Sequence, residues 1–139
     1  MDASPAAQTS ESYRISSDAD VVRVRQSVRT LAVSAELSLV DQTKLVTAVS
    51  ELARNTLVHG GGGDVTIEVV SEGARPGVRV GFEDRGPGIE DVALALTDGW
   101  SSGTGLGLGL SGAKRLVDDF DLRTVPGSGT MVSVVKWSR

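Results

Sequence analysis

The segment from Ser38 to Gly60 constrains the fold most, because one helical pattern contains both an apolar stripe and a stacked pair of polar side chains. Glu51 and Asn55 are four residues apart, so on a helix their side chains lie one above the other on a single face. The apolar stripe predicts that the helix packs on a core. It consists of Leu45, Ala48, Val49, Leu52 and Ala53. The polar pair is either a solvated pair on an exposed face or a pair that faces a cavity beside the core.

Length and charge limit the classes of protein to which this chain can belong. Its 139 residues are enough for one domain, and its net charge of −4 argues against broad contact with nucleic acid or an anionic membrane. It contains neither an apolar run of roughly 18 residues nor an N-terminal signal sequence. Because it has no cysteine and one histidine, disulfides and thiolate metal sites are excluded and zinc chemistry is disfavoured. We expect a cytoplasmic domain without a nucleic-acid or membrane partner.

The first third of the chain predicts a tail followed by two helices. Residues 1–12 are rich in Ala and Ser and lack periodicity, so we expect a disordered tail before a single domain over 13–139. Ser17 is a helix N-cap candidate for a first helix that ends at about Leu37. Ser38 is the corresponding N-cap candidate for the second helix, which contains the polar pair.

Alternating patterns predict the strands. Residues 13–15 fit a short edge strand, and residues 65–69 and 78–82 alternate as two strands of an antiparallel hairpin. Residues 122–125 and 130–137 predict a second hairpin. The last of these strands is apolar at both alternations, which indicates a strand covered on both faces.

Asp84 is a candidate binding residue, because it has the same parity as the apolar residues of the strand that precedes it. Its carboxylate therefore points to the core side, and an unpaired carboxylate is expensive to bury. The turn that follows, Arg85–Gly88, contains two glycines that permit close approach of another group. We expect Asp84 to accept hydrogen bonds from a ligand.

A glycine-rich segment over 98–110 exposes many backbone amides and predicts a mobile cradle for phosphates. A short helix over 90–96 precedes it, and a helix over 111–120 follows, with its N-terminus placed to favour an anion. Trp100 either contacts a partner protein or fills a gap over the core. The match of 107–112 to G-x-G-x-x-G is accidental, because no strand is expected before it and no acid follows about 20 residues later.

Three segments together resemble the N, G1 and G2 boxes of the GHKL ATPases and kinases, which bind nucleotide in the Bergerat fold. They are Glu51-x-x-x-Asn55, Asp84-x-Gly86-x-Gly88 and Gly103-Thr104-Gly105-Leu106-Gly107. The compact size is similar to that of the bacterial anti-sigma regulatory factor kinases, and the runs AVSELARN and GLGLGLSGAKRLVDDFD resemble the stressosome switch kinases among them. The resemblance covers residues 18–137, and Arg85 departs from the usual Asn or Asp.

The resemblance implies a role for each matching residue. Asn55 would hold Mg²⁺, Glu51 would act as general base, and Asp84 would accept from the adenine amino group of ATP, with Thr130 assisting through water. The glycines after Asp84 would admit the base, and the glycine-rich lid would wrap the phosphates. These residues are Gly86 and Gly88 for the base and Gly103, Thr104, Gly105, Leu106, Gly107 and Gly109 for the lid.

The resemblance also implies a fold and a function. We expect an α/β protein of the α+β type, in which a mixed, mainly antiparallel sheet has its helices on one face. The implied activity is that of an ATP-dependent protein serine/threonine kinase that phosphorylates a STAS-domain antagonist and switches to a PP2C-type phosphatase or a sigma factor. Two alternatives stay open: a nucleotide-regulated binding module, such as an anti-sigma factor or phosphatase activator, and a plain ATPase subunit. Retention of Glu51 favours the enzyme.

Overall fold

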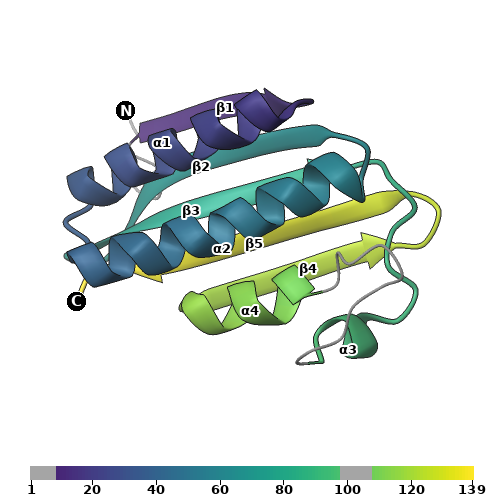
Figure 1. The fold of residues 1–139 in the computed structure, drawn as a ribbon. Coiled ribbons are helices and arrows are strands. Elements are labelled where there is room, and N and C mark those ends of the chain that lie inside the picture. Colours follow the sequence, from purple (N-terminus) through teal and green to yellow (C-terminus); the bar gives the residue numbers. More distant parts are fainter. Residues whose placement is uncertain (1–8, 98–107) are drawn as a thin grey trace, which may run out of the picture.

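A computed structural model describes residues 9–97 and 108–139, in which five strands form one sheet of order β1-β2-β3-β5-β4 (Figure 1). Helices α1, α2 and α4 lie on the same face of this sheet (Figure 1). The elements are β1 (Thr9–Ile15), α1 (Asp18–Ser34), α2 (Leu39–Val58), β2 (Gly63–Glu72), β3 (Arg75–Asp84), α3 (Val92–Ala95), α4 (Leu108–Leu116), β4 (Asp119–Val125) and β5 (Gly129–Trp137). The predicted two-layer fold is confirmed. Every pairing among the described strands is antiparallel, so the parallel part of the predicted mixed sheet is not found there.

The two long helices begin at the predicted caps. The Ser17 side chain accepts a hydrogen bond from the Asp20 backbone N–H, and the Ser38 side chain accepts one from the Asp41 N–H. These bonds satisfy amides that have no partner within the helix. Helix α1 ends three residues before the predicted Leu37, and that side chain is buried in the core.

The core lies between α1, α2 and the sheet. Inward-facing residues of β2, β3 and β5 stand in two rows across the strands, and all of them are buried. The rows are Ile67, Val80 and Val134, and then Val65, Phe82 and Val132. The strand register that aligns these two rows also determines which residues lie side by side in the next row along the same strands.

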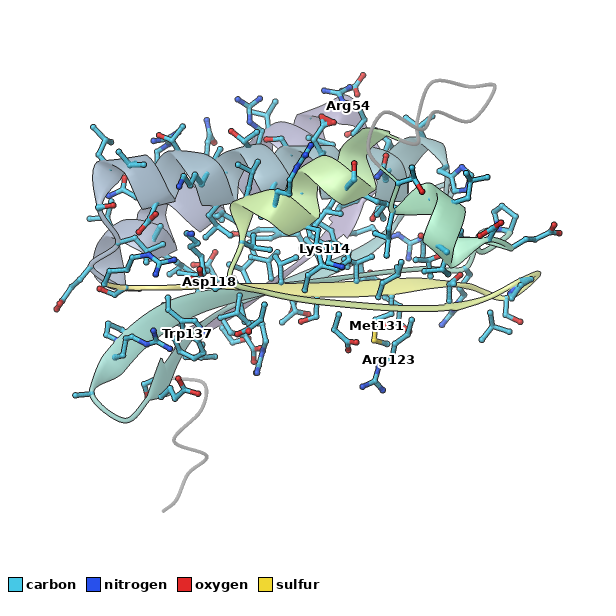
Figure 2. The ribbon with its side chains drawn as sticks, turned by 90° about the horizontal axis from the view of Figure 1, so that it is seen from below. Arg54, Lys114, Asp118, Arg123, Met131 and Trp137 are labelled. Atoms are coloured by element: carbon cyan, nitrogen blue, oxygen red, sulfur yellow. The ribbon has the colours of Figure 1, made fainter. Side chains whose placement is uncertain are left out.

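Strand β5 differs from the prediction, because it is covered on one face only. Val132 and Val134 are buried, whereas Met131 is 45% exposed. Figure 2 shows Met131 and Arg123 on the sheet face opposite the helices. An antiparallel sheet tolerates a solvated face. The apolar residues of this strand therefore did not distinguish a strand covered on both faces from a strand with one face in solvent.

The N-terminal tail and two of the helices also have boundaries that differ from the prediction. Strand β1 begins at Thr9 and pairs with β2, so residues 9–12 belong to the sheet and not to the tail. The helix predicted over 111–120 is α4, which ends four residues earlier, because the Asp118 N–H bonds to the Val135 carbonyl and starts β4. The helix predicted over 90–96 is the single turn of α3. No helix in the described part of the chain is long and apolar enough to span a membrane.

A buried ion network joins the first turn of α2 to the end of β5. Lys136 is 4% exposed, and its Nζ lies 3.6 Å from Asp41 Oδ1 and 3.4 Å from Asp118 Oδ1. The Arg139 side chain contacts both carboxylates. Burial raises the pKa of Asp118, but the backbone N–H of Trp137 and the charges of Lys136 and Arg139 outweigh it, so this pKa lies below its ordinary value.

Candidate functional site

A cavity of about 280 Å³ opens between α2 and the end of the sheet where β3 stops and β5 begins. One wall is a single face of α2, formed by Leu52, Asn55, Thr56 and His59 at the spacing of one helix face. The Thr56 hydroxyl donates to the Leu52 carbonyl, so it is already satisfied inside the helix. Asn55, on the same wall, presents a side-chain amide to the cavity.

Glu51 lies one turn before Asn55 on α2, as the sequence predicts, but its side chain is exposed and does not line the cavity. The predicted stacked pair is thus divided between two environments. Asn55 faces the cavity, and Glu51 faces solvent at its border.

The opposite wall is apolar and is formed by β3 and β5, by the segment between β3 and α4, and by α4 itself. Phe82 and Val132 continue the second buried row into the cavity, and Ile89, Ala95 and Leu110 close its sides. An enclosure of this size with apolar walls suits a flat, mainly apolar ring that carries a few polar atoms.

The floor of the cavity is polar, because the next row of the sheet brings Asp84 beside Thr130. Asp84 lies on the core side, where strand alternation predicts it. Its Oδ1 accepts the Gly86 backbone N–H at 2.9 Å. Gly86 therefore fixes the rotamer of Asp84 and does not itself line the cavity.

Gly60 provides the space in which the Asp84 carboxylate lies. A Cβ atom at Gly60 would come within 2.4 Å of Asp84 Cγ and 2.6 Å of Asp84 Oδ2. The sequence places four glycines, residues 60–63, at the end of the predicted second helix. The run of glycines after a predicted helix was the available signal, but only the tertiary contact shows which of them is required.

The turn after Asp84 is tied to the β4–β5 hairpin. Gly88 lines the cavity at φ +75°, and a Cβ there would approach the Val125 carbonyl oxygen to 2.5 Å. The Ile89 N–H donates to Thr124 Oγ1 at 2.9 Å, and the Gly127 N–H donates to the Pro87 carbonyl at 2.6 Å. Thr124 was not identified from the sequence, since it resembles any exposed strand threonine.

The structure thus brings together four of the predicted site residues, Asn55, Asp84, Gly88 and Thr130, with Gly86 adjacent. Gly109 is in the first turn of α4. The predicted lid residues Gly103, Thr104, Gly105, Leu106 and Gly107, together with Trp100, lie outside the described residues. Closure of this lid on phosphates stays a prediction.

The described side chains around the cavity offer a metal ion few ligands. Within residues 9–97 and 108–139, no group of three His, Asp or Glu side chains could hold one. Among the described residues that line the cavity, Asn55 is the one with a side-chain amide oxygen. This set fits Mg²⁺, which takes most of its ligands from water and phosphate when it accompanies a nucleotide.

Comparisons with known proteins agree with this geometry. Residues 40–138 match the family described as histidine kinase-, DNA gyrase B- and HSP90-like ATPase. The chain is 43% identical over 126 residues to the serine/threonine-protein kinase RsbT of Bacillus subtilis, covering 91% of this chain and 95% of that one. It is 30% identical over 121 residues to the anti-sigma F factor of Clostridium novyi, covering 80% and 85%.

Two solved structures have a similar fold. The structure of the RsbU and RsbW domains of Rv1364c from Mycobacterium tuberculosis superposes with a TM-score of 0.66 at 19% identity, over 95% of this chain and 33% of that longer one. A chain of the SiaB–SiaC complex from Pseudomonas aeruginosa gives a TM-score of 0.57 at 13% identity, over 96% and 91%. These likenesses confirm the predicted Bergerat-type fold. From the family match and the relative at 43% identity, the chain belongs to the GHKL family of histidine kinase-, DNA gyrase B- and HSP90-like ATPases.

Proposed function

We propose that this chain is an ATP-dependent protein serine/threonine kinase that acts in a bacterial partner-switching pathway. The observation that supports this most directly is the acidic floor of an apolar cavity, where Asp84 faces a space lined by Asn55 of α2. The similarity to a named serine/threonine-protein kinase over nearly the whole chain supports the reaction type.

In this proposal the adenine ring occupies the apolar part of the cavity. Phe82 and Val132 contact its face, and Asp84 accepts from its amino group. The phosphates then extend past Asn55 toward the first turn of α4. The N-terminus of this nine-residue helix favours negative charge. Mg²⁺, when bound, neutralises charge on the phosphate oxygens, and the Asn55 amide oxygen is its protein ligand.

Glu51 acts as the general base. In the transfer, the acceptor hydroxyl oxygen forms a bond to the γ-phosphorus, the bond from that phosphorus to the bridging oxygen breaks, and ADP leaves. Glu51 takes the hydroxyl proton. Its exposed position at the border of the cavity suits an acceptor that arrives on another protein. We infer that the acceptor is a serine or threonine of a STAS-domain antagonist.

The partners are proposed from the relatives. An anti-sigma F factor and the RsbU and RsbW domains are among the proteins to which this chain is similar, which supports exchange between an antagonist and a PP2C-type phosphatase or sigma factor. The same similarity favours a second candidate function, a nucleotide-regulated binding module in which sequestration outweighs transfer.

Two substitutions test the proposal and separate these candidates. Asp84→Asn presents an amide where the adenine amino group needs an acceptor, so it should abolish ATP binding in calorimetry. Glu51→Gln should bind Mg²⁺–ATP normally and lose transfer to a purified STAS-domain protein by about 100-fold or more. Glu83→Gln is the matched control, because Glu83 is an exposed neighbour of Asp84 on the strand.

Each outcome has a definite reading. Normal ATP binding by Asp84→Asn would contradict the adenine assignment. Normal transfer by Glu51→Gln would remove Glu51 as the base. A wild-type chain that binds ATP and a STAS-domain protein without transferring phosphate would favour the binding module over the kinase.

A further inference from the structure

Thr124 has a hydroxyl with three polar neighbours at the end of the sheet. Its Oγ1 accepts the Ile89 backbone N–H at 2.9 Å and donates to the Gly129 carbonyl oxygen at 3.1 Å. Thr130 Oγ1 lies 3.0 Å from the same atom. The first two bonds have a fixed direction, because an amide can only donate and a carbonyl oxygen can only accept.

The direction of the third bond follows from proton counting. A threonine hydroxyl has one proton and two lone pairs. Since Thr124 gives its proton to Gly129, it has only lone pairs for its other neighbours, and one of these accepts Ile89 N–H. Thr130 must then donate its own proton to Thr124.

This arrangement determines what Thr130 can offer a ligand. With its proton directed at Thr124, the Thr130 hydroxyl presents lone pairs to the cavity that it lines. Asp84, its neighbour in the same row, is an acceptor when ionised. The two polar side chains on the floor are therefore both acceptors, and a ring that occupies the cavity must present donors there.

We propose that Thr124 is a positioning residue that selects the nucleobase, by holding the Thr130 hydroxyl as an acceptor. This rests on the proposed function, in which the cavity binds the base of a nucleoside triphosphate. A 6-aminopurine presents an amine with two N–H donors to the two acceptors. A 6-oxopurine bound in the same orientation places a carbonyl oxygen where the amine would lie, so the two acceptors lose those two donors and face a third acceptor, which disfavours its binding.

Thr124 does not line the cavity, and it acts through Thr130. It lies on β4, directly opposite Thr130 in the register of the β4–β5 pair. A purely structural role, in which Thr124 only anchors Ile89 and the turn, predicts a general loss of affinity. The positioning role predicts a loss of affinity only for nucleotides that carry the 6-amino group.

The experiment measures binding of ATP and of purine riboside 5′-triphosphate, which has hydrogen in place of the amino group, with GTP as a third ligand. Thr124→Val should reduce the preference for ATP over the des-amino nucleotide by about three- to tenfold, the effect of one neutral hydrogen bond. Thr124→Ser keeps the hydroxyl and should retain the wild-type preference. Thr130→Val should lose the same preference, and the double variant should lose no more than Thr130→Val alone.

Equal weakening of both nucleotides by Thr124→Val, or full preference in Thr130→Val, would overturn the inference. Thermal unfolding of each variant identifies loss of folding, and if Thr124→Val does not fold, Thr124→Ala replaces it because it removes the hydroxyl without adding atoms. Failure of the wild-type chain to bind ATP would instead refute the proposed function, so the two failures are distinguishable.

Discussion

Substitution of Gly60 by alanine should weaken ATP binding, although this residue does not line the cavity. The added Cβ would lie 2.4 Å from Asp84 Cγ, which is 1.0 Å short of the 3.4 Å where ordinary van der Waals contact begins. The same Cβ meets Asp84 Cβ at 2.6 Å, so a change of rotamer alone does not relieve the overlap. The carboxylate must therefore move by about 1 Å with its backbone.

A displacement of that size lengthens a hydrogen bond of about 2.9 Å beyond its useful range. A hydrogen bond to a charged group contributes about 1.5–3 kcal/mol, so the Kd for ATP should rise roughly ten- to 150-fold. Overpacking also lowers the free energy of unfolding by about 1–3 kcal/mol. Calorimetric titration with ATP, at a temperature where thermal unfolding shows the variant to be folded, measures the first effect separately from the second.

Gly81→Ala is the matched control. Gly81 lies on the same strand as Asp84, and a Cβ there meets nothing within 4 Å. This variant should bind ATP like the wild type. An unchanged Kd in Gly60→Ala, with the variant folded, would show that Asp84 does not need its present position and would refute the reasoning.

Two further predictions concern the ion network. Lys136→Met leaves the buried carboxylate of Asp41 with Arg139 as its one remaining charged partner in the network. It should lower the free energy of unfolding by about 3 kcal/mol in urea titration. The control is Lys44→Met, an exposed change on α2, the helix of Asp41, which should have almost no effect. A loss below about 1 kcal/mol would contradict this view of the network. Because the pKa of Asp118 is lowered on folding, its contribution to stability is present above its unfolded pKa of about 4 and is lost as pH falls through the folded value. Asp118→Asn should therefore lose less stability than the wild type on acidification from about pH 5 to 3, and equal pH profiles would count against the lowered pKa.

Local patterns predicted much of this fold. The caps at Ser17 and Ser38 and the alternation in β2 and β3 depend on neighbouring residues only, and all four were found as expected. The same alternation put Asp84 on the core side, where it lines the cavity. Local rules suffice at these positions because the side chain and its partner are close in sequence.

The rest depends on contacts between distant segments. The exposure of Met131 depends on which sheet face the helices cover, and the role of Gly60 depends on a side chain of another strand. Thr124 gains its role from Thr130 across the hairpin and from Ile89 in a distant turn. Glu51 and Asn55 were predicted as one stacked pair, but the cavity wall ends between them.

The sheet order has a consequence for how this chain folds. Strand β5 pairs with β3, although α3, α4 and β4 separate them in sequence, so the pairing closes a long loop. The acceptors Asp84 and Thr130 become neighbours only in that step. A partly folded chain in which α1, α2, β2 and β3 have assembled therefore lacks the nucleobase site. Nucleotide should then slow unfolding and stabilise the native state by mass action, while leaving the early folding rate unchanged.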